Sequence, residues 1–191
     1  MKKRCQWPSA IELEYHDSEW GVPVNSDKKW FEFLVLDSFQ AGLSWKIILQ
    51  KREGFRKAFH DFDVQRVAEM TQEEQEKLLN DSSIIRNRLK IKATVSNAQA
   101  FIRIQKEYGS FNAYIWKFTN GKTIHNSFKE LSEIPATTLL SDKMSKELKG
   151  KGFKFVGSTI CYAYMQASGI VNDHTVDCFR HSEIQKISFN K

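Results

Sequence analysis

The sequence is poor in cysteine, proline and glycine, and it has no long apolar run. Only 3 Cys, 3 Pro and 9 Gly occur among its 191 residues. An odd number of irregularly spaced cysteines is not a disulfide framework, so we expect a reducing, cytoplasmic environment. The low glycine and proline content excludes collagen-like and low-complexity chains. No stretch approaches about eighteen uncharged apolar residues, so we expect neither a membrane span nor a signal peptide.

Apolar and aromatic residues are plentiful by contrast. Hydrophobic residues make up 41% of the chain and aromatic residues 13%, which is enough for a buried core. The length fits one compact unit, residues 1–191, and no internal repeat or clear linker divides it. The 29 Lys and Arg exceed the 23 Asp and Glu, and the net charge of +6 favours a polyanionic partner without proving one.

The apolar residues recur at three- and four-residue spacing far more often than they alternate, which predicts an all-α fold. Ser26, Ser44, Asp63 and Thr71 are each placed to cap the start of a helix, and the helix after Ser44 is expected to continue through Phe55. These segments predict helices packed on helices.

Three features are expected between residues 82 and 135. A long helix should end near Gly109, a natural residue for a helix C-terminus. The pattern then fades over residues 121–135, which we interpret as a loop. Within the run between residues 82 and 106, which has no acidic residue, the basic side chains are Arg86, Arg88, Lys90, Lys92, Arg103 and Lys106. Their spacing places the first four on different helix faces, so only some can contact one partner.

A predicted helical hairpin covers about residues 141–169. Ser141 begins its first helix, Ser158 caps its second, and the turn between them is Gly152-Phe153-Lys154-Phe155-Val156-Gly157. Backbone N–H groups at the start of the second helix form a ready site for an anion such as a DNA phosphate. Positive charge is added nearby by Lys143, Lys146, Lys149, Lys151 and Lys154. The alternative is a tight turn with a solvated lysine face.

Two cysteines and two histidines near the chain ends form a candidate metal site. Cys5, His16, His174 and Cys178 supply two thiolates and two imidazoles, a usual donor set for tetrahedral Zn²⁺. On a helix, His174 and Cys178 would share one face. The spacing matches no compact zinc-finger motif, so unlinked cysteines and surface histidines are the alternative, and His181 is a rival ligand. Four protein ligands leave no open position, so the metal is expected to be structural.

Aromatic residues gather in the first quarter of the chain, and most of them are expected to pack in the core. Asp37 lies shortly before Trp45, at the junction of two predicted helices. A carboxylate beside a tryptophan at such a junction can bind a flat cationic ring by charge and stacking.

These motifs together resemble the 3-methyladenine DNA glycosylase I family over nearly the whole chain. The resemblance is carried by Arg4-Cys5-Gln6-Trp7, Tyr15-His16-Asp17-Ser18-Glu19-Trp20-Gly21-Val22-Pro23, Gln40-Ala41-Gly42-Leu43-Ser44-Trp45, Ile84-Ile85-Arg86-Asn87-Arg88, Gly152-Phe153-Lys154-Phe155-Val156-Gly157 and Val171-Asn172-Asp173-His174. It implies a helix-hairpin-helix glycosylase fold and excision of 3-methyladenine from DNA in base excision repair. It also implies a structural Zn²⁺ held by Cys5, His16, His174 and Cys178.

The resemblance further implies a base pocket. Trp45 would be a stacking wall, Trp7 a second wall, Tyr15 a polar contact, and Asp37 the carboxylate that faces the base. Family members usually carry Glu at the position of Asp37, so this carboxylate is one methylene shorter.

The wider superfamily carries a catalytic aspartate where this chain has Asn172, and we expect the next residue, Asp173, to orient His174. No lysine stands where a bifunctional lyase needs its nucleophile. The resemblance therefore implies a monofunctional glycosylase, and we expect it to act as a monomer on double-stranded DNA. The alternatives are a DNA-damage-binding module that has lost catalysis and a glycosylase with a shifted alkylpurine preference.

Overall fold

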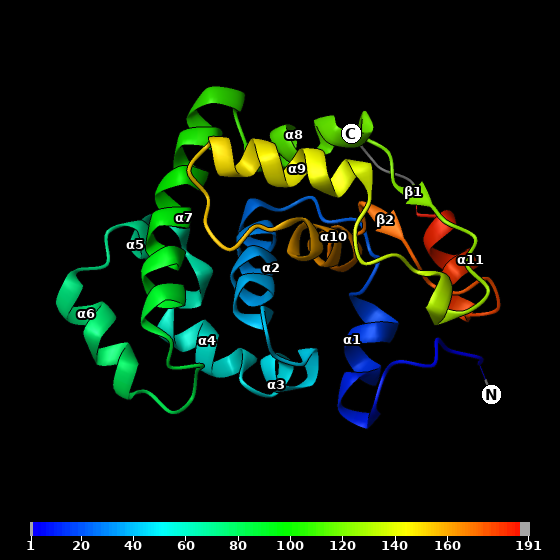
Figure 1. The fold of residues 1–191 in the computed structure, drawn as a ribbon, viewed down its shortest axis with the longest axis horizontal. Helices are drawn as coiled ribbons and strands as arrows, with labels where there is room; N and C mark the ends of the chain where they lie inside the picture. The colour runs from blue at the N-terminus through cyan, green and yellow to red at the C-terminus, as the bar shows by residue number, and fades with distance from the viewer. Residues whose placement is uncertain (1, 188–191) are drawn as a thin grey trace.

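The computed structural model describes residues 2–187, and they are predominantly helical (Figure 1). The predicted single unit also includes residues 1 and 188–191, which lie outside this range. The α-helices are α1 (Leu13–Ser18), α2 (Asp27–Gln40), α3 (Trp45–Gln50), α4 (Arg52–Ala58), α5 (Val64–Ala68), α6 (Gln72–Lys77), α7 (Arg88–Tyr108), α8 (Phe111–Trp116), α9 (Leu139–Gly150), α10 (Ser158–Ala167) and α11 (Phe179–Gln185). Short 3-10 helices lie at Ala10–Glu12, His60–Phe62, Leu78–Asn80, Lys117–Thr119 and Leu131–Glu133. The all-α prediction is confirmed.

Helices α2 and α10 lie in the middle of the molecule, with α7 along one side and α9 across the top of the view in Figure 1. Aromatic rings fill the space between them. Trp30 of α2 packs against Tyr164 of α10 with ring centroids 5.6 Å apart, and Phe101 of α7 stacks on Phe111 of α8 at 4.0 Å. All four side chains are almost completely buried. This aromatic core fixes the positions of the helices that carry the site.

A group of ion pairs attaches the segment after α1 to the central helices. The Arg52 guanidinium donates to Glu19 at 2.6 and 2.7 Å and to Glu32 at 2.8 Å, while Lys29 donates to both carboxylates. Burial alone would raise the pKa of Glu19, but the hydrogen bonds from Arg52 and Lys29 lower it to about 2. The N-terminal segment is therefore anchored electrostatically as well as by packing.

Helix starts lie close to the predicted positions, but one predicted helix is wrong. Ser26, Ser44, Asp63 and Thr71 are all N-cap residues. The helix expected to continue through Phe55 is instead divided into α3 and α4. The break is at Lys51, whose φ of −102° and ψ of 3° leave helical geometry. No glycine or proline marks this point in the sequence.

The helical hairpin is present with shifted boundaries, because α9 and α10 span 139–167 rather than 141–169. Thr138, not Ser141, is the N-cap of α9, and its hydroxyl accepts the Ser141 N–H at 3.2 Å. Gly157, not Ser158, precedes α10 as its N-cap. The Ser158 hydroxyl instead donates to Asp142 on α9, at 2.5 Å, so it joins the two helices.

A small parallel strand pair occurs where a loop was predicted. β1 (Ile124–His125) pairs with β2 (Val171–Asn172), with Ile124 opposite Val171 and His125 opposite Asn172. Strands this short leave no alternating pattern in a sequence. The pair ties the long connection after α8 to the segment that follows α10.

Among residues 2–187, no helix combines the length and the apolar character needed to cross a bilayer.

Gly169, which follows α10, has a φ of +72°, and an added Cβ there would lie 2.4 Å from backbone atoms of Val22 and Pro23. We expect Gly169→Ala to lower the free energy of unfolding by about 3 kcal/mol, because it adds backbone strain and steric overlap. Urea denaturation measures this change. Gly109→Ala is the matched control, since Gly109 has a φ of +84° but open space at the Cβ position. Gly109→Ala should lower the free energy of unfolding by only about 1–2 kcal/mol. Equal losses of stability in the two variants would contradict the close approach of Gly169 to Val22 and Pro23.

Candidate functional site

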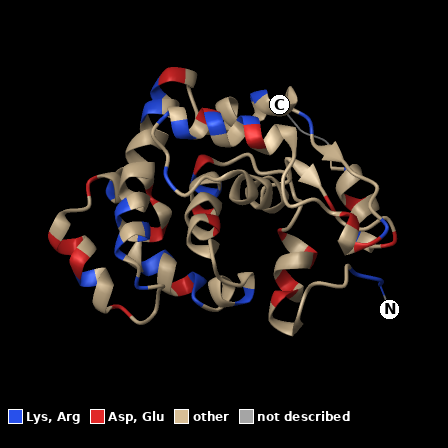
Figure 2. Ribbon diagram, in the orientation of Figure 1, with Lys and Arg blue, Asp and Glu red and all other residues tan. Residues whose placement is uncertain are grey.

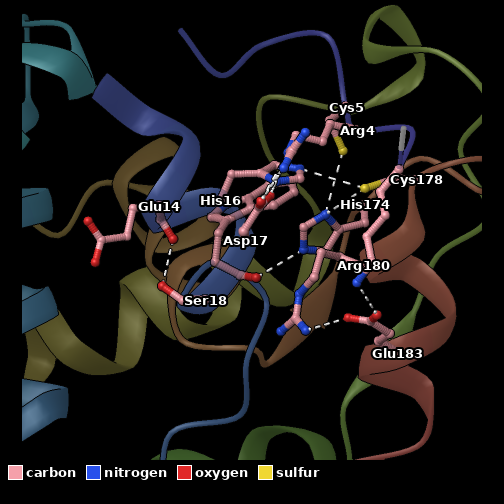
Figure 3. A network of polar contacts seen from close by, with 12 residues as sticks. Arg4, Cys5, Glu14, His16, Asp17, Ser18, His174, Cys178, Arg180 and Glu183 are labelled. Carbon is pink, nitrogen blue, oxygen red and sulfur yellow. Dashed lines mark hydrogen bonds and ion pairs between the residues drawn. The ribbon is translucent and has the colours of Figure 1, made fainter. Parts of the chain in front are cut away.

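The four predicted metal ligands meet between the N-terminal segment and the start of α11 (Figure 3). All four residues are buried, and their ligand atoms lie within 4.8 Å of one another. Cys178 Sγ is 3.5 Å from His174 Nδ1 and 3.7 Å from His16 Nε2, and Cys5 Sγ is 3.6 Å from His174 Nδ1. A tetrahedral zinc site with ordinary bond lengths has sulfur–nitrogen edges of about 3.6 Å. The donor set and spacing therefore fit Zn²⁺.

The outer nitrogens of both histidines are held by acceptors. His16 Nδ1 lies 2.8 Å from Asp17 Oδ1, and His174 Nε2 lies 3.0 Å from the Trp20 carbonyl oxygen. Arg4 in turn donates to Asp17 at 2.7 Å. A proton on each outer nitrogen leaves the inner nitrogen with a free lone pair, the arrangement found at metal-bound histidines.

Cys178 is also suited to bind a metal ion, whereas the hydrogen bond with Cys178 and burial raise the pKa of the Cys5 thiol. The pKa of the Cys178 thiol is lowered, chiefly by its hydrogen bond with Cys5 and further by His16 and His174, although burial opposes the shift. The thiolate is the form that binds a metal ion.

Two details of the expected metal site are wrong, and the rival ligand is ruled out. His174 and Cys178 do not share a helix, because Cys178 is the N-cap of α11 and His174 lies in the turn before it. His181 is not in the cluster, and its Nε2 is 2.9 Å from the Asn126 carbonyl oxygen. Asp173 does not orient His174, since it accepts hydrogen bonds from other side chains. The turn brings the ligands together without helical spacing.

A pocket of about 360 Å³ lies beside the cluster, between the N-terminal segment, α2, the start of α3 and α10. The four residues expected to form a base pocket all line it, together with other residues; the lining consists of Trp7, Tyr15, Trp20, Asp37, Gln40, Trp45, Leu131, Ile134, Ala163, Gln166 and Ala167. The Tyr15 ring centroid is 5.0 Å from that of Trp45 and 6.5 Å from that of Trp7. The arrangement provides flat aromatic walls for a ring-shaped ligand.

Asp37 lies near the C-terminal end of α2 and is only 2% exposed. Its Oδ2 has no hydrogen-bond partner among the described residues, and burial raises the pKa of this carboxyl well above its usual value. The Nε1 atoms of Trp7 and Trp45 are also without partners within residues 2–187. Buried polar atoms are normally satisfied, so these three atoms point to a ligand that completes them.

Several pocket residues were not found by reading the sequence. Gln40, Ala163, Gln166 and Ala167 line the cavity, but neither an amide nor an alanine signals a site in a helical pattern. Their role is visible only once α10 packs against α2. Asn172, where the resemblance implies an aspartate in the wider superfamily, does not line the pocket. Its amide donates to the His181 carbonyl oxygen at 3.1 Å.

The turn between α9 and α10 differs in part from the predicted anion site. Gly152 and Phe155 have positive φ angles, and Phe153 and Val156 are buried. The Lys154 N–H donates to the Asn97 side chain at 2.8 Å, so it is not available to an anion. The N–H groups in the first turn of α10 have no partner within their helix.

The basic stretch around the start of α7 is divided between surface and interior, and Arg86 lies before the helix rather than on one of its faces. Lys90 is buried, and its ammonium donates to the carbonyl oxygens of Phe39 at 2.8 Å and Ala41 at 2.6 Å, where α2 ends. Burial lowers its pKa. Its Nζ lies 6.0 Å from the centroid of the Phe155 ring. Figure 2 shows further Lys and Arg residues along α7 and α9, whereas α6 is rich in acidic residues.

Comparison with known sequences gives a consistent result. The family model of methyladenine glycosylases matches residues 5–181. DNA-3-methyladenine glycosylase 1 of Escherichia coli (strain K12) is 48% identical over 178 residues, which cover 92% of this chain and 95% of that protein. DNA-3-methyladenine glycosylase of Haemophilus influenzae is 43% identical over 180 residues, or 93% and 97% of the two chains.

Solved structures agree with the sequence comparison. A crystal structure of a 3-methyladenine DNA glycosylase I superposes with a TM-score of 0.90 at 46% identity, covering 93% of this chain and 98% of that one. The 3-methyladenine DNA glycosylase I of Staphylococcus aureus, studied for its recognition of 3-methyladenine, gives a TM-score of 0.87 at 36% identity, with coverage of 90% and 91%. The likeness therefore extends over nearly the whole of each chain.

The metal centre is tested by replacing one ligand. We expect Cys178→Ser to bind Zn²⁺ much more weakly than the parent protein and to unfold at a lower urea concentration. The loss of affinity should exceed the roughly 10- to 100-fold that is typical when a metal ligand loses its hydrogen-bond partner, because here a ligand itself is removed. Metal analysis of purified protein and urea denaturation measure both effects. Cys161→Ser is the matched control, because this buried cysteine lies on α10 outside the cluster. A full metal complement in Cys178→Ser would contradict the ligand assignment.

The environment of Asp37 predicts that replacing its carboxyl raises the stability of the folded protein in a pH-dependent way. Between the usual pKa of 3.8 and the raised folded value, the folded state retains a proton that the unfolded state releases, so rising pH destabilises the fold. Asp37→Asn should therefore be more stable than the parent at pH 7, by about 1–3 kcal/mol, and the difference should shrink at pH 4. Urea denaturation of both proteins at each pH measures it.

The control for this prediction is Asp177→Asn, whose parent carboxylate has its pKa lowered by a hydrogen bond from Lys3. Because that shift has the opposite sign, this variant should show no gain at pH 7. A pH-independent effect of Asp37→Asn would contradict the buried carboxyl.

Proposed function

The chain belongs to the methyladenine glycosylase family, and we propose that it excises 3-methyladenine from alkylated DNA by hydrolysing the N-glycosidic bond. At the site itself, the proposal is supported above all by the buried, unpaired carboxyl of Asp37. This carboxyl lies beside Trp45 in a cavity of about 360 Å³. Pockets for small aromatic ligands have this size and combine flat apolar walls with a few polar atoms.

The chemistry demands little of the protein, because the damaged base is already activated. Methylation at N3 gives adenine a positive charge. Cleavage releases a neutral purine while the sugar becomes oxocarbenium-like, so a proton donor to the base is dispensable. The protein must chiefly turn the nucleotide out of the duplex, hold the ring between aromatic side chains and admit water to the sugar.

Asp37 supplies negative potential at the pocket. A cationic purine favours the ionised carboxylate, which then accepts hydrogen bonds from the purine edge. Trp45 and Trp7 supply aromatic faces that prefer a flat cation over neutral adenine. Because the base loses its charge in the transition state, a tight ion pair with Asp37 also slows cleavage, so this carboxylate serves selectivity first.

Tyr15 completes the polar part of the pocket. Burial raises the pKa of its hydroxyl well above the usual value, and the nearby charge of Asp37 adds to the shift. The hydroxyl therefore stays protonated at neutral pH and is able both to donate and to accept a hydrogen bond.

We propose that Cys5, His16, His174 and Cys178 hold a structural Zn²⁺, which supplies a cross-link between the two ends of the chain. The four protein donors leave no open position for substrate, so these residues have no part in hydrolysis. Their effect on the pocket is positional. Trp7 lies two residues after Cys5, and Tyr15 directly precedes His16, so fixing the ligands also fixes two walls of the pocket.

Double-stranded DNA is the proposed partner, and the hairpin of α9 and α10 is its proposed contact through a helix-hairpin-helix turn. The support is the positive N-terminal end of α10, together with exposed Lys146, Lys149 and Lys154 around the turn. A monomer is the proposed active form.

The function is tested by measuring free base released from methylated duplex DNA by zinc-loaded protein. We expect the parent protein to release 3-methyladenine. Asp37→Asn should lower release at subsaturating DNA by about 10- to 100-fold, because the cationic base loses a charged hydrogen-bond partner in the pocket. Trp45→Ala should lower it by about tenfold or more, because a stacking surface is lost. Both variants should keep the parent affinity for duplex DNA within a factor of about two.

Two conservative variants are the controls. Asp37→Glu keeps the charge and Trp45→Phe keeps a ring, so each should retain more activity than its partner variant. Salt-dependent duplex binding by the parent without any base release would identify a damage-binding module instead. Release of another alkylpurine in place of 3-methyladenine would identify a shifted preference.

A further inference from the structure

The α10 wall of the pocket has one polar side chain. Gln166 lines the cavity together with Ala163 and Ala167, and these two alanines leave the amide group of Gln166 as the wall's only side-chain hydrogen-bonding group. The amide is not free to rotate, because its Nε2 donates to Asp173 Oδ2 at 2.8 Å.

Asp173 is held in place from three directions. It is 1% exposed, and the same Oδ2 accepts the Tyr162 hydroxyl at 2.7 Å, while Oδ1 accepts Asn126 Nδ2 at 2.6 Å. A carboxylate has no hydrogen to donate, so only the nitrogen side of the Gln166 amide can face it. Because the nitrogen and oxygen of an amide diverge from one carbon, Oε1 is directed away from Asp173.

We propose that Gln166 is a specificity residue that reads the purine edge through Oε1, and that Asp173 is the positioning residue that fixes this orientation. The inference rests on the proposed glycosylase function. The six-position of 3-methyladenine carries an amino group, which donates hydrogen bonds, whereas that of 3-methylguanine carries an oxygen, which accepts them. An acceptor held in the wall therefore favours the adenine edge and disfavours the guanine edge.

The position of Gln166 complements that of Asp37. The two residues come from α10 and α2, which pack against each other, and both line the cavity. The Asp37 carboxylate carries charge and attracts the cationic ring. The Gln166 amide is neutral and responds to the hydrogen-bonding pattern at the edge of the purine. Asp173 does not line the pocket, so its effect on the base acts through Gln166.

The test compares 3-methyladenine with 3-methylguanine released from one methylated duplex, at matched protein loading. Gln166→Ala should lower the ratio of the two rates by about 3- to 10-fold, the effect of one neutral hydrogen bond. Asp173→Asn places a donor beside Gln166, so the amide can turn and present its NH₂ group. It should lower the ratio by a similar factor. The affinities of the two free bases, measured by titration calorimetry, should change in the same direction.

The double variant separates positioning from a general structural effect. In Gln166→Ala protein, the further change Asp173→Asn should leave the ratio unaltered, because there is no amide left to orient. Tyr162→Phe is the matched control, since it removes a donor from the same Asp173 oxygen but leaves Gln166 in place. It should lower stability without changing the ratio.

The outcomes distinguish the two proposals. If the parent protein releases no 3-methyladenine, the proposed function fails. If the parent releases it normally and either Gln166→Ala or Asp173→Asn leaves the ratio and the free-base affinities unchanged, the inference about these residues is wrong. If Asp173→Asn does not fold, Gln166→Ala still tests the role of Gln166. The Gln166→Ala variant is expected to fold, because Asp173 keeps its hydrogen bonds from Tyr162 and Asn126.

Discussion

The meeting of two chain ends at one buried point is the constraint on which the rest of the structure depends. Cys5 and His16 come from the first segment, and His174 and Cys178 come from the last. The first segment is also joined to α10, where the Gly21 N–H donates to the Gln166 carbonyl oxygen at 2.9 Å. The aromatic walls therefore depend on contacts that are remote in sequence.

The buried carboxyl of Asp37 affects folding and binding in opposite directions. A carboxyl at Asp37 is buried without a partner, which disfavours the folded protein at neutral pH. The same burial makes a cationic ring a better partner than water, because charge interactions are stronger in a poorly solvated cavity. The shorter side chain at this position keeps the charge close to α2, and the neutral amide of Gln166 lies on the opposing helix. The proposed selectivity for a charged, flat base rests on this division between two helices.

Much of the fold was predictable because local signals and global packing agree. Ser26, Asp63 and Thr71 mark helix starts, and helical periodicity gives the class. The Cys/His cluster and the main pocket residues followed from residue chemistry together with a family resemblance. The break at Lys51 was missed because no residue there disfavours a helix. Lys90 looked like a surface charge, since only tertiary packing shows that its ammonium reaches the end of α2. The role of Gln166 depends on a hydrogen bond that no sequence pattern reports.

The buried ammonium of Lys90 has a structural consequence. Its Nζ donates to the carbonyl oxygens of Phe39 and Ala41, at the end of the helix that carries Asp37. The same Nζ lies 6.0 Å from the centroid of the Phe155 ring in the hairpin turn. The end of α2 and the turn proposed to contact DNA therefore both lie close to the same nitrogen atom of α7. One buried side chain thus relates the helix that carries Asp37 to a turn that is far from it in the sequence.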